Sequence, residues 1–234
     1  MEIEEIVKPE KRKLKTEDTG KIFEMAICMA LNIPYDGRYK YSTEEATRIK
    51  TKLVNGGFID ICPPLIHTAK KGARYDFTSI SDPAIHLSAK TTKKGGGKVA
   101  PQVIGQGQPI KLCEVLGILF EDVPTLKRYI QENIHTILPV MMEHTFDCPN
   151  IFYNAEKDTI QYITFMTPID WTSYEFIWTC NSENWANSST LKLKDGVALL
   201  EVQFHTKSRT NMAIRWYYTN FLQTFKDHFK IIII

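Results

Sequence analysis

A pair of strands joined by a short turn is the feature that most limits how this chain can fold. Residues 74–92 alternate polar and apolar side chains on either side of a proline-containing turn at 81–83. Strands joined so closely pair as an antiparallel hairpin. Because side chains alternate across a strand, Asp76 then shares one face of the hairpin with Ser88 and Lys90. The pattern therefore predicts a carboxylate, a hydroxyl and an ammonium group close together on a sheet surface.

An acid and a lysine placed in this way suit the hydrolysis of a phosphodiester bond. The Asp76 carboxylate would hold Mg²⁺, a hard cation that prefers oxygen ligands and keeps several waters. The metal would stabilise charge on the phosphate and help to form hydroxide, while Lys90 would orient or deprotonate the attacking water. Spacing alone leaves a second interpretation open, in which Asp76 and Lys90 form a solvated ion pair between neighbouring strands.

The same residues also resemble a family pattern. Asp76, followed twelve positions later by Ser88-Ala89-Lys90, resembles the PD-(D/E)XK nuclease motif. Residues 87–92 and 99–106 resemble the core of certain type II restriction enzymes, and the resemblance as a whole covers about residues 19–108. It implies a restriction-endonuclease-like core, in which helices flank a central mixed sheet. It also implies an endonuclease that uses Mg²⁺ to cut duplex DNA at a specific short sequence.

Two positions depart from that motif. Tyr75 rather than proline precedes Asp76, and Ser88 stands where the motif has an aspartate or glutamate. A serine hydroxyl is a poor metal ligand beside a carboxylate, so either another acid completes the site or catalysis is weak. Asp82 lies only six residues before Ser88, within the turn, and matches the motif acid less well than Asp76 does.

Two glutamates are candidates for the missing carboxylate. Residues 19–24 resemble the first helix of the restriction-endonuclease fold, which often supplies a glutamate to the metal site, so Glu24 is the first candidate. The alternative for Glu24 is an exposed helix residue. A weaker resemblance at 197–218 includes Glu201, on the polar face of an alternating strand. Glu201 is the second candidate if that face looks toward DNA, and a solvent-facing sheet edge is its alternative.

Basic and amide side chains elsewhere suit contact with DNA. Lysines flank three glycines at 95–97, which allow a loop to approach a phosphate backbone closely. Arginine and asparagine side chains beyond the alternating strand have the geometry to read guanine and adenine. The alternatives are a disordered basic loop, surface glutamines, and a basic hairpin turn packed on an aromatic core. The predicted DNA contacts are Lys93, Lys94, Lys98, Gln102, Gln106, Gln203, His205, Arg209, Asn211 and Arg215.

Composition and missing motifs argue against several other classes of protein. The net charge of +2 is far from that of a histone-like binder. The five cysteines are widely spaced with no CxxC pair, which predicts reduced thiols rather than a zinc site. No GxxxxGK[ST], GxSxG or paired-histidine motif is present. There is no run of about 18 apolar residues and no signal peptide, so we expect a cytoplasmic protein; the resemblance implies a bacterial or viral source.

The order of elements predicts an α+β (mixed α/β) fold in a single domain spanning residues 1–234. Residues 19–108 would form the nuclease core, and residues 109–234 would complete the sheet and serve recognition and dimerisation. Helices are expected at 21–32, at 43–54 after a Ser42/Glu45 capping box, from Pro101, at 123–137 after Asp122 as a cap, and at 217–229. Strands are expected at 74–80, 84–92, 151–153, 159–165, 174–179, 190–193, 197–205 and 212–216.

The interpretation we favour from sequence is a type II site-specific endodeoxyribonuclease that acts as a homodimer. A palindromic site is most simply read by a protein with two-fold symmetry. A structure-specific repair or junction nuclease, which would recognise shape rather than sequence, is one alternative. The other is a DNA-binding module with a decayed site, for which Ser88 is the reason.

Overall fold

A computed structural model describes residues 16–37, 42–69, 73–94, 96–205 and 211–234. The helices are α1 (Thr16–Leu31), α2 (Thr43–Asn55), α3 (Phe58–Ile61), α4 (Pro109–Leu116), α5 (Val123–Glu132), α6 (Ile134–Phe146) and α7 (Tyr218–Thr224), with short 3-10 turns at Trp171–Ser173 and Lys226–His228. The strands are β1 (Leu65–His67), β2 (Phe77–Ser79), β3 (His86–Thr92), β4 (Lys98–Val99), β5 (Gln106–Gly107), β6 (Asn150–Asn154), β7 (Thr159–Phe165), β8 (Phe176–Trp178), β9 (Ser188–Leu193), β10 (Ala198–Phe204), β11 (Met212–Tyr217) and β12 (Phe229–Ile233).

The first sheet is mixed and lies at the centre of the molecule. Its strand order is β1-β2-β3-β6-β7-β12, with β3 and β6 parallel and the other neighbours antiparallel. Side chains on one face, among them Phe77, Leu87 and Ile151, are buried against α1 and α2. Phe152 and Ile163 point from the opposite face into a second core, which contains residues of α6 and α7. The sheet is therefore packed on both faces, and the predicted α+β fold with a mixed sheet between helices is confirmed.

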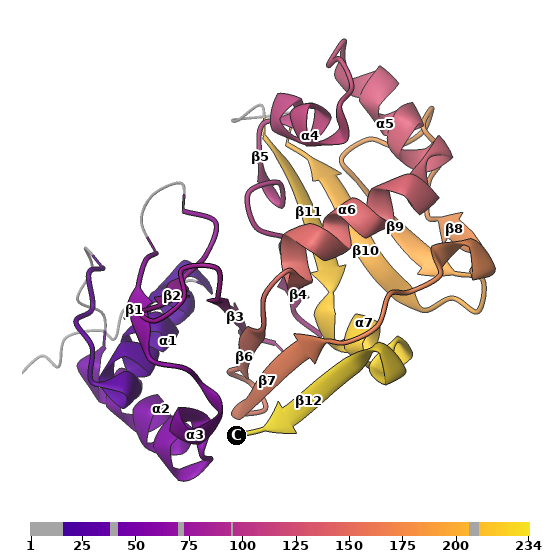
Figure 1. The fold of residues 1–234 in the computed structure, drawn as a ribbon. Coiled ribbons are helices and arrows are strands. Elements are labelled where there is room, and N and C mark those ends of the chain that lie inside the picture. Colours follow the sequence, from indigo (N-terminus) through magenta and orange to yellow (C-terminus); the bar gives the residue numbers. More distant parts are fainter. Residues whose placement is uncertain (1–15, 38–41, 70–72, 95, 206–210) are drawn as a thin grey trace, which may run out of the picture.

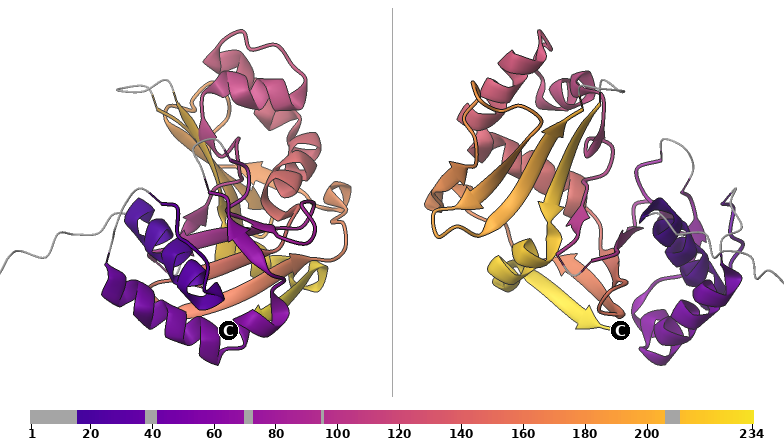
Figure 2. Two further views of the ribbon diagram at one scale, coloured as in Figure 1. Left: turned by 60° about the vertical axis from the view of Figure 1, so that its left-hand side comes forward. Right: turned by 180° about the vertical axis from the view of Figure 1, so that it is seen from behind.

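The second sheet has the order β4-β11-β10-β9-β8, with β5 beside β11. Leu200, Val202 and Phe204 on β10 are buried in the core shared with α5 and α6, as their alternation predicts. Figures 1 and 2 show α4, α5 and α6 on one face of this sheet. Figure 1 also shows that α1, α2 and α3 with β1 and β2 form one lobe and the second sheet with α4–α6 forms another. β3, β6, β7 and β12 join the two lobes.

Two predicted helix starts are confirmed by their capping bonds. The Ser42 hydroxyl accepts the backbone N–H of Glu45 at 3.2 Å, and the Asp122 carboxylate accepts that of Thr125 at 2.7 Å. The prediction of reduced cysteines also holds, since all five are free thiols. In the described residues, no helix has the length and apolar character that a membrane span requires.

The predicted helix from Pro101 is wrong. Residues 101–105 form turns, and the next helix begins at Pro109, which takes the first helical position in its place. Val103 has a φ of 65°, in the left-handed region that a right-handed helix cannot contain. Gln102 and Gln106 therefore do not lie one turn apart on a helix: the first is in the turn and the second is in β5.

Two further helix predictions need correction. The helix expected at 217–229 ends at Thr224, and β12 follows, paired with β7, because its consecutive isoleucines favour a strand. The helix expected at 123–137 is interrupted at Asn133, whose side-chain amide turns back to the carbonyl of Tyr129 at 2.9 Å. The strand expected at 74–80 is shorter, since β2 begins at Phe77 and leaves Asp76 in the segment before it.

The turn that holds Gln102 predicts a contrast between two glycines. A Cβ at Gly105 would overlap the carbonyl oxygen of Pro101, whereas a Cβ at Gly107 would have its nearest neighbour at 3.8 Å. Gly105→Ala should therefore destabilise the protein by about 1–3 kcal/mol, as overpacking typically does. Thermal unfolding is the measurement, with Gly107→Ala as the matched control; equal melting temperatures for the two variants would contradict this view of the turn.

Candidate active site

Asp76 lies at the start of the hairpin, opposite Ser88. β2 pairs with β3 so that Phe77 faces Leu87, and the preceding residue, Asp76, then meets Ser88. Its Oδ2 accepts the backbone N–H of Ala89 at 2.8 Å and the Ser88 hydroxyl at 3.3 Å. No described residue donates a hydrogen bond to Oδ1 of Asp76. The carboxylate is thus fixed through one oxygen, and the other remains available to a ligand.

Lys90 lies two residues beyond Ser88 on the same face of β3 and is half-buried. Burial lowers the pKa of its ammonium group, and the Asp76 carboxylate only partly opposes that shift. Burial likewise raises the pKa of Asp76, with Lys90 lowering it and Glu24 raising it further. Both shifts favour the uncharged forms, which is the environment in which a lysine can accept a proton from water.

Glu24 approaches the same site from α1. It is 7% exposed, so the alternative of an exposed helix residue is wrong. The ammonium group of Lys21 lies 3.0 Å from both carboxylate oxygens of Glu24, and Nε2 of His67 lies 3.4 Å from Oε2. The Nδ1 atom of His67 accepts the backbone N–H of Asp36, so the ring carries its proton on Nε2 and donates it to Glu24. The Glu24 carboxylate is one of the groups that raise the pKa of Asp76, so its charge acts on the site.

The oxygen atoms of these side chains fit a magnesium ion better than a zinc ion. Within the described ranges, no three His, Cys, Asp or Glu side chains lie close enough to hold a metal together. Mg²⁺ is commonly bound by one or two carboxylates and keeps several waters, so Asp76 and Glu24 are of the right type, but Glu24 would have to exchange the Lys21 ammonium that contacts both of its oxygens. The unshared Oδ1 atom of Asp76 is the first oxygen that such an ion would use.

Gln102 reaches this site from the turn after β4. Its side-chain amide donates to the Ser88 hydroxyl oxygen, and Gln102 itself is 8% exposed. The predicted role of Gln102 as a DNA contact assumed a helix from Pro101, where the structure has turns instead. The structure instead buries its side chain against the motif serine. A residue fourteen positions from Ser88 gives no signal of this contact in the sequence, because the contact depends on a turn.

Glu201 belongs to a separate polar cluster on the second sheet. Lys98 binds one of its carboxylate oxygens at 2.7 Å and Arg215 binds the other at 2.6 Å. Arg215 also donates to the Gln203 side chain, and the Lys98 ammonium lies 4.6 Å from the centre of the Tyr217 ring. Both oxygens of Glu201 are therefore occupied, and the structure does not bring this second candidate carboxylate to Asp76.

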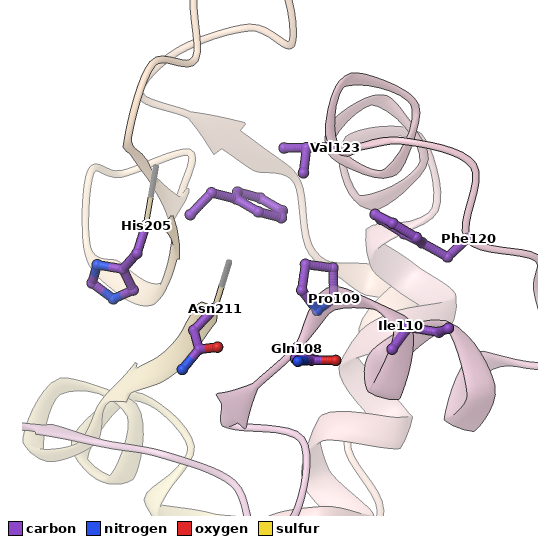
Figure 3. A pocket seen from close by; sticks show the side chains of 8 residues that line it. Gln108, Pro109, Ile110, Phe120, Val123, His205 and Asn211 are labelled. Atoms are coloured by element: carbon purple, nitrogen blue, oxygen red, sulfur yellow. The ribbon is translucent and has the colours of Figure 1, made fainter. Parts of the chain in front are cut away.

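The remaining predicted contacts are spread over other parts of the surface. Lys93 is half-buried and Lys94 exposed just beyond β3, and Gln106 is exposed on β5. His205 and Asn211 line a mostly apolar pocket of about 470 Å³, which Figure 3 shows beside α4. Its lining is Gln108, Pro109, Ile110, Phe120, Val123, Phe204, His205 and Asn211, and it shares no residue with the group around Asp76. Arg209 lies outside the described residues.

Comparison with known proteins adds one finding. No protein-family model matches the chain, and no solved structure matches it. The chain is similar to a viral enzyme. It is 38% identical over 224 residues to the type II restriction enzyme CviAII of Paramecium bursaria Chlorella virus 1. The aligned region takes in 94% of this chain but 64% of the viral enzyme, so the chain spans less than two thirds of its relative's length.

The burial of Lys90 predicts a gain in stability when its charge is removed. Because the folded pKa lies below the unfolded one, the folded protein binds this proton more weakly, so stability falls as the pH drops from the unfolded pKa toward the lowered folded pKa and levels off below it. At pH 7, below the unfolded pKa, burial of this amine therefore lowers the stability of the fold, and Lys90→Met should raise the melting temperature by about 2–4 °C. Lys230→Met, at an exposed position on β12, is the control and should not change it. A lower melting temperature for Lys90→Met would contradict the assigned burial.

Proposed function

We propose that the chain is a Mg²⁺-dependent, site-specific endonuclease of the type II restriction kind, which hydrolyses phosphodiester bonds in duplex DNA. The observation that carries the proposal is the pair formed by Asp76 and Lys90 on the β2–β3 hairpin, at the spacing of the PD-(D/E)XK motif. The similarity to a protein named as a type II restriction enzyme supports the same reaction.

The chemistry divides among three side chains. Asp76 and Glu24 would hold Mg²⁺, which when bound neutralises phosphate charge and lowers the pKa of a coordinated water. Lys90 would take up the proton of the attacking water, because its own pKa is lowered by burial. The Ala89 N–H and the Ser88 hydroxyl hold Oδ2 of Asp76 in place, so the opposite oxygen faces the ligand without rearrangement.

DNA would be held by groups around this site. Lys94 is exposed just beyond β3, the strand that carries Ser88 and Lys90, and would contact a phosphate of the bound DNA. Further candidates for phosphate contact are Lys93, Lys98 and Arg215, although the Glu201 carboxylate neutralises part of the positive charge of Lys98 and Arg215. A homodimer is proposed because a palindromic target presents the same groups to each of two symmetric subunits.

A DNA-binding module without catalysis is the second candidate function. Ser88 in place of the motif acid favours it, as does the lack, within the described chain, of a three-residue metal cluster. The two candidates make opposite predictions in one assay. Unmethylated phage DNA should give discrete fragments with Mg²⁺ and none with EDTA if the chain is a restriction enzyme. DNA that stays intact under both conditions, with binding retained, would favour the binding module.

Removal of either member of the central pair should abolish cleavage. Asp76→Asn removes the metal-binding charge and Lys90→Met removes the proton acceptor, so each should lower the cleavage rate at least about 100-fold. The rate is measured on a substrate of mapped sequence, and circular dichroism and DNA binding in Ca²⁺ serve as controls for folding. A variant that folds, binds and still cuts at the wild-type rate would remove that residue from the proposed mechanism.

Substitutions of Glu24 and of Glu201 should have different effects on Mg²⁺ dependence and on stability. Glu24→Gln should raise the Mg²⁺ concentration needed for half-maximal cleavage by about 10-fold, since it removes a ligand charge. Glu201→Gln should leave that concentration unchanged but lower the melting temperature, because Lys98 and Arg215 lose their shared partner. Cleavage is titrated with Mg²⁺ and unfolding is followed by heating. The reverse pattern would transfer the metal role to Glu201.

A further inference from the structure

A directed chain of hydrogen bonds runs from Gln102 through Ser88 to Asp76. A carboxylate only accepts hydrogen bonds, so the Ser88 hydroxyl donates its one proton to Oδ2 of Asp76. The Ser88 oxygen then accepts from the side-chain amide of Gln102. The carboxylate at one end therefore fixes the direction of both bonds.

The far end of this chain is held firmly. The Gln102 backbone N–H donates to the carbonyl of His144 on α6 at 2.7 Å, and Nδ1 of His144 donates back to the Gln102 carbonyl at 3.2 Å. The next residue, Val103, has a φ of 65°, which a β-branched residue rarely adopts. A strained turn, held to His144 through both backbone groups of Gln102, thus keeps Gln102 pointing at Ser88, which is consistent with a role beyond filling space.

Two side-chain amide oxygens near Ser88 could accept further hydrogen bonds. Oε1 of Gln102 and Oδ1 of Asn150 are buried, and neither has a hydrogen-bond partner among the described residues. Asn150 pairs with Ser88 across the parallel β3–β6 ladder, so the two side chains share one face of the sheet. Buried polar atoms are seldom left unpaired, so these two oxygens could each accept a further hydrogen bond.

The charge of Asp76 explains why two neutral side chains, Ser88 and Gln102, suit the place beside it. An acid at position 88 would put a second negative charge beside Asp76, whose pKa is already raised by burial and by Glu24. The Ser88 hydroxyl with the Gln102 amide orients Asp76 and adds no charge. The site can then draw its second carboxylate from α1, through Glu24, rather than from β3.

We propose that Gln102 is a positioning residue: acting through Ser88, it holds the Asp76 carboxylate in the orientation that binds a divalent cation. Together with Ser88, it thereby orients the one motif carboxylate that this hairpin retains, while the acid missing at position 88 has to be supplied from elsewhere. The proposal rests on the proposed function, because it takes cation binding by Asp76 from there. It differs from the predicted role of Gln102 as a DNA contact, since the side chain is 8% exposed and is engaged inside the protein.

The test is a double-mutant cycle read out by metal binding in the absence of DNA. Mg²⁺ is titrated calorimetrically into the wild type, Gln102→Met, Ser88→Ala and the double variant. Loss of a residue that orients a metal ligand typically costs 10–100-fold in affinity, so each single variant should bind Mg²⁺ at least about 10-fold more weakly. The double variant should be no weaker than Ser88→Ala alone, because both substitutions break the same chain.

Three controls separate positioning from general damage. Gln223→Met removes an amide at an exposed position on α7 and should leave Mg²⁺ affinity unchanged. Melting temperatures exclude unfolding, and Ser88→Ala breaks the same bond from its other end if Gln102→Met does not fold. Cleavage by Gln102→Met should recover at high Mg²⁺ concentration, which a purely structural defect would not do.

The proposal has two outcomes that overturn it. One is wild-type Mg²⁺ affinity in Gln102→Met while Asp76→Asn has lost binding. The other is an equal loss from Gln102→Met in the Ser88 and Ser88→Ala backgrounds, which would mean that Gln102 does not act through Ser88. Failure of the proposed function is distinguishable, since the wild type itself would then bind no Mg²⁺ or Asp76→Asn would retain its affinity.

Discussion

The arrangement of the site depends on how one half-buried carboxylate is held. Oδ2 of Asp76 accepts the backbone N–H of Ala89 and the Ser88 hydroxyl, and the backbone carbonyl of Asp76 accepts N–H groups from Thr68 and Ala69. The residue is thus tied to β3 through its side chain and to the segment after β1 through its main chain. Because the hairpin register sets all of these bonds, a shift of one residue would turn Ser88 and Lys90 away from Asp76.

This arrangement is unfavourable for stability in the absence of a ligand. Burial raises the pKa of Asp76 and lowers that of Lys90, so both charged forms are destabilised inside the protein. Glu24 adds a second carboxylate nearby, and Lys21 with His67 offsets part of its charge. Groups whose pKa values are moved in opposite directions are typical of catalytic acid–base sites. The packing of the sheet on both faces stabilises the fold enough to hold them there.

On the second sheet, the buried carboxylate of Glu201 is neutralised by ion pairs. Glu201 is almost as buried as Glu24, but Lys98 and Arg215 occupy both of its oxygens. A carboxylate with two cationic partners has little capacity left for a metal, whereas Asp76 keeps one oxygen free. The partners of each oxygen, rather than the depth of burial, therefore decide which carboxylate can bind a ligand directly, and Glu24 would have to exchange its Lys21 contact to do so. β4 carries Lys98 to β11, so this cluster also fixes the chain that leads into the Gln102 turn.

Much of the site was determined by the sequence itself. Alternation around a short turn placed Asp76 opposite Ser88 and Lys90, and the caps at Ser42 and Asp122 marked two helix starts, because these are local effects of backbone geometry. The tertiary structure decided what local rules cannot. A turn with Val103 at positive φ stands in place of a predicted helix, and it directs the Gln102 side chain to Ser88. Glu24 is buried on α1, and Glu201 forms ion pairs with Lys98 and Arg215. Each of these depends on residues far apart in the chain, whose distances are set only when the two lobes pack on the shared sheet.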